Sequence, residues 1–250
     1  MRAETRHQLK QDRFSKVTIE AAENAAHWSE EHKAKLIVIV IAVVVLASIG
    51  FGGWYYINTQ DEKASAELST AVRTFETPVR PAGVPAQPGF DTFASSQERA
   101  TAARKQFQDI VDKYPHTRTA DMARYFVGLA SAQLNDNAAA ASNLQEVANS
   151  SNKELAALGK FALASVYRGE PGGGKVPGSA DAHVIDLYKQ LIDKPTLVVS
   201  KATAQLELAG FYESRGLAAE AKKLYDEVAK ENPATEAASD AQKRAAVLKQ

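Results

Sequence analysis

The seven residues from Gly169 to Lys175 read GEPGGGK and match the G-x-x-x-x-G-K pattern of phosphate-binding loops. In such a loop the backbone amides hold the phosphates, the lysine reaches them, and a following serine or threonine binds Mg²⁺. Here Val176 and Pro177 follow the lysine, and a helical pattern leads into the motif where a strand is needed. Proline also removes an amide donor from the turn that would hold the phosphates. We therefore interpret these residues as a glycine-rich connector and expect no bound nucleotide.

Other residue types with catalytic or metal-binding chemistry are scattered along the chain. The five histidines form neither an H-E-x-x-H motif nor a cluster with carboxylates at metal-ligand spacing. The G-x-S-x-G motif of serine hydrolases does not occur, and the lack of cysteine excludes disulfides, thiolate metal sites and a cysteine nucleophile. Lysine plus arginine number 30, equal to aspartate plus glutamate, so no global positive field attracts nucleic acid. We expect a protein that is not an enzyme, with no metal or other cofactor and no nucleic-acid partner.

The most informative element is residues 36–57, LIVIVIAVVVLASIGFGGWYYI, which contain no charged side chain. A helix of this length extends about 33 Å, close to the thickness of the hydrocarbon core of a bilayer. Trp54, Tyr55 and Tyr56 lie at one end, where aromatic rings favour the headgroup region. The alternative is a cleaved signal peptide, but its apolar region is shorter and lies closer to the N-terminus. We predict an uncleaved helix that spans a membrane.

Basic residues predict the orientation of this span. Seven lysines and arginines precede it, whereas three lie between its end and Arg80. Because positively charged residues hold their side of a span in the cytoplasm, we predict a cytoplasmic polar tail, residues 1–35, and a C-terminal domain, residues 58–250, on the outer side.

The C-terminal domain has helical periodicity, with apolar residues at spacings of three and four, and no segment that reads as a strand. We therefore predict an all-α fold with loops at 78–94 and 169–179. The first loop contains four prolines in two PxxP pairs, which fit either a polyproline-binding partner or a stiff connection between packed helices. Ser95 with Glu98, and Ser151 with Glu154, have capping-box spacing and predict two helix starts.

A repeated pattern relates the helices to one another. Around Gly216 the order is leucine, small, aromatic, glycine, alanine, aromatic, small apolar, proline, represented by Leu208, Ala209, Tyr212, Gly216, Ala221, Tyr225, Val228 and Pro233. This order resembles the tetratricopeptide repeat, in which small residues let two antiparallel helices approach and aromatic residues fill the space between them. Weaker copies occur at 127–147, 164–195 and 103–115. We predict a tetratricopeptide-like array of antiparallel helix pairs.

The repeat register assigns seven residues to the groove that first helices line in this family. They are Met122, Tyr125, Leu129, Gln133, Leu158, Phe161 and Arg168. Tyr125 and Phe161 take the fifth position of a first helix, where a ring either faces a bound partner or fills the seam between neighbouring repeats. Both alternatives remain open at this point.

A single N-terminal span followed by degenerate tetratricopeptide helices resembles the YfgM-like family of ancillary SecYEG translocon subunits. The resemblance covers nearly the whole chain and includes the Tyr114-Pro115 ending of an early repeat. It implies a single-pass protein of the bacterial inner membrane with a periplasmic domain. Its partners would be the SecYEG translocon, periplasmic chaperones and emerging secretory chains. The alternative is a tetratricopeptide scaffold for envelope or outer-membrane assembly.

Overall fold

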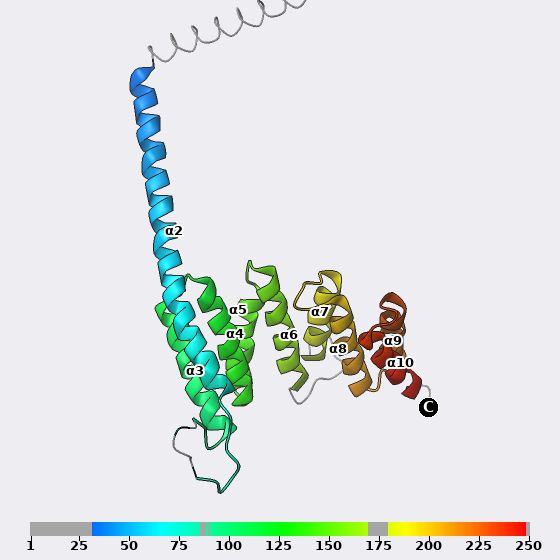
Figure 1. Ribbon diagram of the computed structural model, residues 1–250. Helices are drawn as coiled ribbons and strands as arrows, with labels where there is room; N and C mark the ends of the chain where they lie inside the picture. Colours follow the sequence, from blue (N-terminus) through cyan, green and yellow to red (C-terminus); the bar gives the residue numbers. More distant parts are fainter. Residues whose placement is uncertain (1–31, 86–88, 90, 170–179, 249–250) are drawn as a thin grey trace, which may run out of the picture. The chain divides into compact units, whose positions relative to one another are not determined.

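The computed structural model describes residues 32–85, 89, 91–169 and 180–248. Its helices are α2 (Lys33–Glu76), α3 (Ser96–Lys113), α4 (Arg118–Gln133), α5 (Asn137–Ala148), α6 (Lys153–Gly169), α7 (Ala180–Asp193), α8 (Lys201–Ser214), α9 (Ala218–Glu231) and α10 (Glu236–Val247). The described residues contain no β-sheet, so the predicted all-α class is confirmed (Figure 1). The chain divides into two units, residues up to Ile57 and residues from Asn58 onward.

In the first unit, α2 carries the apolar segment. Among the described residues, α2 is the helix that is long and apolar enough to cross a membrane, judged by length and composition. Its apolar side chains are exposed: Leu46 is 68% and Trp54 61% accessible. Such exposure is unfavourable in water, because each buried large apolar side chain gains about 1.5–3 kcal/mol.

The second unit begins with the end of α2, residues 58–76, which packs against α3 and α4. Ala64 and Ala71 are buried at this contact, where their small side chains allow a close approach. Phe75, Phe107 and Phe126 form an aromatic cluster with ring centroids 4.9–6.1 Å apart. This spacing is favourable for aromatic pairs and joins the three helices into one core.

Two carboxylates of α2 fasten the same contact. Asp61 Oδ1 accepts a hydrogen bond from the backbone N–H of Thr119 at 2.9 Å, in the first turn of α4. Glu67 Oε1 accepts hydrogen bonds from Lys113 Nζ at 2.5 Å and from the Tyr114 hydroxyl at 2.8 Å. The hydrogen bond from Lys113 lowers the pKa of Glu67 most, and the hydrogen bond from Tyr114 lowers it further.

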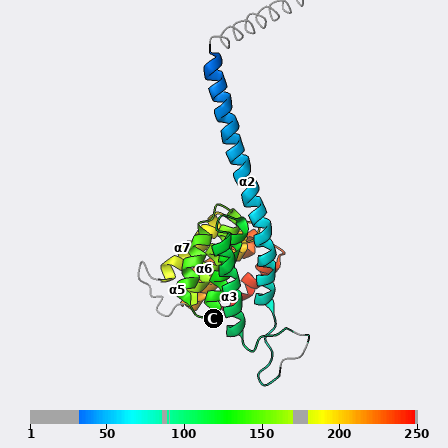
Figure 2. The same cartoon turned by 90° about the vertical axis from the view of Figure 1, so that its left-hand side faces the viewer.

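Consecutive helices from α3 to α10 pack against one another. The helices form the hairpins α4–α5, α6–α7 and α8–α9, with α10 packed on α9. Short turns join α4 to α5 and α8 to α9. Figure 2, turned by 90°, shows α3, α5, α6 and α7 overlapping along the line of sight, as a stack of hairpins requires.

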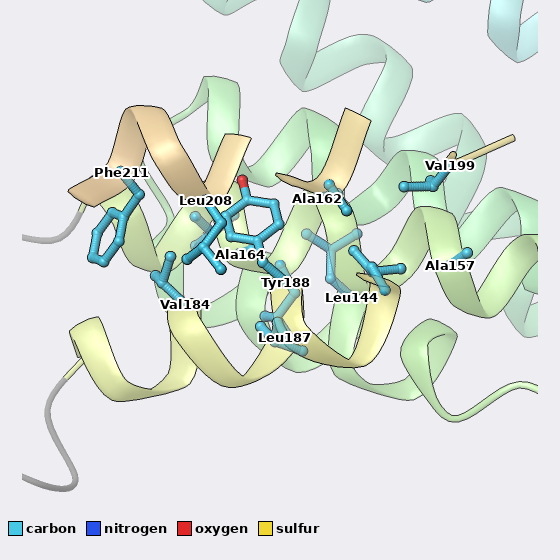
Figure 3. Packing of buried hydrophobic residues seen from close by; sticks show 14 of the residues in the cluster. Leu144, Ala157, Ala162, Ala164, Val184, Leu187, Tyr188, Val199, Leu208 and Phe211 are labelled. Carbon is cyan, nitrogen blue, oxygen red and sulfur yellow. The ribbon is translucent and has the colours of Figure 1, made fainter. Parts of the chain in front are cut away.

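The largest core lies between α5, α6, α7 and α8. Leu144, Tyr188, Leu208 and Phe211 are at most 2% exposed and belong to the one core cluster drawn in Figure 3. A second cluster, around Tyr225 of α9, joins α8, α9 and α10. Each cluster is built from neighbouring hairpins, so each hairpin buries its apolar face against the next.

Two glycines allow neighbouring helices to come unusually close. A Cβ atom at Gly128 would lie 2.6 Å from Leu144 Cγ, and one at Gly159 would lie 2.6 Å from the backbone nitrogen of Ala148. The repeat pattern identifies Gly128 as a small position of the α4–α5 hairpin. It does not identify Gly159, which packs α6 against the backbone of the preceding helix.

One predicted helix cap is confirmed and one is wrong. Ser95 Oγ accepts the Glu98 N–H at 3.1 Å, and Glu98 accepts the backbone N–H of Ala94 at 2.9 Å. At α6, Asn152 Oδ1 caps the helix by accepting the N–H groups of residues 154 and 155 at 3.1 and 3.2 Å, so Ser151 is not the cap. The Glu154 carboxylate instead accepts the backbone N–H groups of residues 197 and 198, at 3.5 and 3.2 Å.

The ends of both predicted loops are held by hydrogen bonds. At the proline loop, Arg80 N donates to Phe93 O at 3.0 Å and Phe93 N donates to Pro78 O at 3.1 Å, which closes the stem. At the glycine-rich connector, Asp181 in the first turn of α7 receives hydrogen bonds of 2.8–3.1 Å from Arg215. Residues 86–88, 90 and 170–179 lie outside the described part of the chain, and so does most of the GEPGGGK motif.

Candidate partner-binding face

The first helices of the hairpins carry the seven predicted groove residues. Helix α4 contacts α6, and α8 contacts α10, in addition to the contacts within each hairpin. We term the surface carried by α4, α6, α8 and α10 the first-helix face. Four of the predicted residues lie on α4 and three on α6.

On α4 the four residues are spaced by three or four positions, which places them on one side of the helix. Met122, Tyr125 and Leu129 are half-buried, whereas Gln133 at the C-terminal end is exposed. Tyr125 and Leu129 pack against the largest core cluster, and burial raises the pKa of the Tyr125 hydroxyl. Tyr125 therefore packs on the core while it stays partly accessible.

On α6, Phe161 has the same mixed character. It is half-buried and meets the buried Tyr188 edge to face, with centroids 6.0 Å apart. Leu158, one turn earlier, is half-buried as well. Tyr125, Leu129 and Phe161 thus all pack against one core cluster, so they help to fill the seam between neighbouring repeats. Their role in binding a partner remains a prediction.

Arg168, at the end of α6, connects this surface to α8. Its Nη1 donates to Glu207 Oε2 at 3.0 Å, and both side chains are about 40% exposed. A Cβ atom at Gly210 of α8 would lie 3.9 Å from Arg168 Nη2 and 3.8 Å from Arg244 Nη1, so two guanidinium groups approach the same glycine. Burial, together with the charge of Glu207, raises the pKa of Tyr188 to about 12.

The repeat register missed Glu207, Gly210 and Arg244, because charged and glycine positions are not part of the apolar pattern that defines the register. Their link to Arg168 spans 39 residues or more and depends on how consecutive hairpins stack. The first-helix face is therefore aromatic and apolar on α4 and α6, and charged from Arg168 onward. A surface with this composition suits an amphipathic segment of another protein.

Within the described part of the chain, no group of three or more His, Asp or Glu side chains lies close enough together to hold a metal ion. The histidines at 7 and 27 lie outside the described residues. His183 instead packs its ring against Tyr167, with centroids 5.4 Å apart.

The turns repeat with the same backbone geometry. Within two hairpins the turn residue has positive φ, 59° at Asn135 and 70° at Gly216. In both turns the next N–H bonds five residues back, from Asp136 to Ser131 O and from Leu217 to Tyr212 O, each at 2.9 Å. Asparagine tolerates this left-handed conformation, so it replaces the glycine of the repeat pattern.

The turns between hairpins also match. Thr117 follows Tyr114-Pro115 and caps α4 through the Ala120 N–H at 3.0 Å. Thr235 follows Asn232-Pro233 and caps α10 through the Ala238 N–H at 3.2 Å. A stack of helical hairpins with recurring turns and an accessible first-helix face defines a protein-interaction scaffold of the helical-repeat class.

Comparison with known families agrees with this class. The family described as "tetratricopeptide repeat-like domain" matches residues 26–171, from before α2 to just beyond α6, and the chain belongs to this family. The α8–α9 hairpin, which lies beyond the matched residues, contains the most complete copy of the repeat pattern. A search of curated proteins gave no significant match.

Proposed function

We propose that this chain is a membrane-anchored adaptor that brings other proteins together at the inner membrane of a bacterium. Residues 1–35 form the cytoplasmic tail, residues 36–57 span the bilayer and residues 58–250 form the periplasmic interaction domain. The composition and exposure of α2 and the excess of basic residues before the span support this arrangement. The domain binds partners and catalyses no reaction.

We further propose that the adaptor is an ancillary component of the SecYEG translocon. Its first-helix face would hold periplasmic chaperones or emerging secretory chains. The translocon part of this proposal rests on the resemblance to the YfgM-like family. The binding face is supported by the half-buried aromatic rings of Tyr125 and Phe161, together with the exposed Gln133 and the Arg168–Glu207 pair. A few aromatic and arginine residues commonly supply most of the binding energy of an interface.

Site-specific photo-crosslinking tests the binding face in the full chain. A photoreactive amino acid at Gln133 lies on a first helix, and the same residue at Gln145 lies on the second helix α5; both glutamines are exposed. We expect crosslinks to translocon subunits, periplasmic chaperones or secretory chains from position 133 and few from position 145. Crosslinks to envelope-assembly components would favour the scaffold alternative. Equal yields at the two positions would contradict the proposed face.

The membrane topology requires a separate test. Because the chain contains no cysteine, only an introduced cysteine can react with a thiol reagent. Single cysteines are introduced as Ser15→Cys and Ser214→Cys; Ser214 is exposed at the end of α8. A thiol reagent that cannot cross membranes should label Ser214→Cys in intact spheroplasts and leave Ser15→Cys unlabelled until the membrane is permeabilised. The opposite pattern would reverse the orientation and rule out a periplasmic binding domain.

A further inference from the structure

A second candidate binding site, which includes none of the seven predicted groove residues, lies where α5 ends, α6 begins and α7 ends. A cavity of about 420 Å³ opens there. It is lined by Ala148, Asn149, Ser150, Lys153, Ala156, Ala157, Lys160, Gln190, Leu191, Lys194, Pro195 and Thr196. We term it the lysine pocket. Its floor is apolar, and its rim carries three lysines together with amide and hydroxyl groups.

The charges of this pocket are unbalanced. None of the described residues that line it is acidic. Lys153, Lys160 and Lys194 also have no ion-pair partner within the described part of the chain, although the other parts of the domain contain many lysine and arginine pairs. The closest acidic side chain on α6, Glu154, is occupied by the backbone N–H groups of residues 197 and 198. Three like charges around one cavity repel one another, and an anionic ligand would relieve that repulsion.

The rim of the pocket is held in place before any ligand binds. Pro195 and Thr196 belong to the turn that the Glu154 carboxylate fastens to α6. Within this turn Thr196 N donates to Val199 O at 3.0 Å, and Val199 N donates to Thr196 Oγ1 at 3.1 Å. A pre-formed rim lowers the entropy cost of binding.

The spacing of the lysines indicates the kind of anion. Lys153 and Lys160 are two turns apart on α6, roughly 10.5 Å along the helix axis. A single phosphate or carboxylate could meet both only if the two side chains converged on it, which would bring their like charges together. In an extended chain, alternate side chains lie on one side and repeat about every 6.6 Å, so an alternating acidic sequence presents several carboxylates over this distance. We propose that the lysine pocket binds an acidic, extended segment of a partner protein, independently of the first-helix face.

A peptide-binding experiment tests this site on the full chain in phosphatidylcholine nanodiscs. The probe is a fluorescent decapeptide of alternating glutamate and alanine, and its control has glutamine in place of glutamate. The test variant is the triple substitution Lys153→Gln, Lys160→Gln, Lys194→Gln, which keeps helix propensity nearly constant. We expect the triple variant to bind the acidic peptide about tenfold more weakly. Each substitution removes one exposed lysine–carboxylate pair, and each such pair contributes a small part of the binding free energy.

A matched control variant removes the same charge elsewhere. Lys222, Lys223 and Lys230 line an open surface of α9, but Asp226 and Glu227 lie among them. The corresponding triple glutamine variant should bind the acidic peptide within about twofold of wild type, because Lys222 is paired with Asp226 and the carboxylate of Glu227 also lines this surface.

Four results would overturn the proposal. The first is unchanged binding of the acidic peptide by the pocket variant, and the second is an equal loss in the α9 variant. The third is competition by inorganic phosphate as effective as that by unlabelled peptide, which would indicate a site for a single anion. The fourth is binding of phosphatidylglycerol vesicles through the pocket lysines without binding of the peptide, which would make a membrane surface the occupant. The Gln133 crosslinks report on the other face, so failure here leaves the adaptor function standing.

Discussion

Three helical glycines allow one substitution to be compared in three surroundings. Glycine to alanine in a helix interior gains roughly 0.8–1 kcal/mol of propensity at each position. At Gly159 the new Cβ would lie 2.6 Å from the Ala148 nitrogen and 2.9 Å from the Val147 carbonyl carbon, both backbone atoms that cannot move alone. At Gly128 it would meet the side chain of Leu144 at 2.6 Å. At Gly210 its nearest neighbour would be a flexible arginine at 3.8 Å.

These distances predict that the substitution destabilises the protein at Gly159 and stabilises it at Gly210. Overpacking costs about 1–3 kcal/mol and should outweigh the propensity gain at Gly159, so that Gly159→Ala loses about 1–2 kcal/mol net. Gly128→Ala should fall between, because the Leu144 side chain can adjust. Gly210→Ala should gain about 0.5–1 kcal/mol.

The measurement is thermal unfolding of the full chain in a non-ionic detergent, followed by circular dichroism at 222 nm. For a domain of this size, 1 kcal/mol corresponds to a shift of about 2–4 °C in the midpoint. We expect Gly159→Ala to melt several degrees below wild type and Gly210→Ala slightly above it. If Gly159→Ala were as stable as wild type, the close contact between α5 and α6 would be refuted. If both variants were destabilised equally, the argument from local space would fail.

Three further predictions concern the packing and charges of the domain. Ala221 is fully buried between α8 and α9, so Ala221→Leu should lower the free energy of unfolding in urea by about 1–3 kcal/mol. Ala219 is exposed, so Ala219→Leu should cost little. Equal costs at the two positions would refute the register. Asp181→Asn should lose about 1–3 kcal/mol, because it replaces a carboxylate that accepts charged hydrogen bonds from Arg215; a thermal midpoint equal to wild type would contradict this. The pKa of Glu67 is lowered in the folded state, so its stabilising effect is present above the unfolded value near 4.5 and disappears as pH falls through the folded value. The midpoint of Glu67→Gln should therefore change less than that of wild type between about pH 7 and pH 3, and parallel curves would argue against the contact.

Much of the fold could be predicted because its determinants are local. The left-handed turn at Gly216 and the buried positions of Ala221 and Tyr225 follow from residue types at fixed offsets, and these offsets are repeated. The helix start at Ser95 follows from a cap within four residues. Asn135 shows the limit of such reasoning, because asparagine performs the role of the repeat glycine without matching the pattern.

The remaining features depend on contacts between hairpins, which a linear pattern does not contain. Ser151 was predicted as a cap because Glu154 stands three residues later, but Glu154 is engaged more than 40 residues away. Gly159 is needed only because α5 passes so close to α6. In the candidate face, Arg168 was found from the register, whereas its partner Glu207 belongs to the next first helix.

Because Arg215 holds Asp181 in place, the packing of the hairpins does not depend on the length of the connector that precedes α7. One end of the connector leaves α6 next to the Arg168–Glu207 pair, and the other arrives at a turn that Arg215 already holds. Both ends are thus positioned by residues outside the connector. Loop-closure entropy rises slowly, by about 0.6 kcal/mol for each doubling of length. We therefore expect the chain to accept inserted sequence between Gly169 and Ala180, including an epitope or a reporter domain, while the hairpins on either side keep their packing.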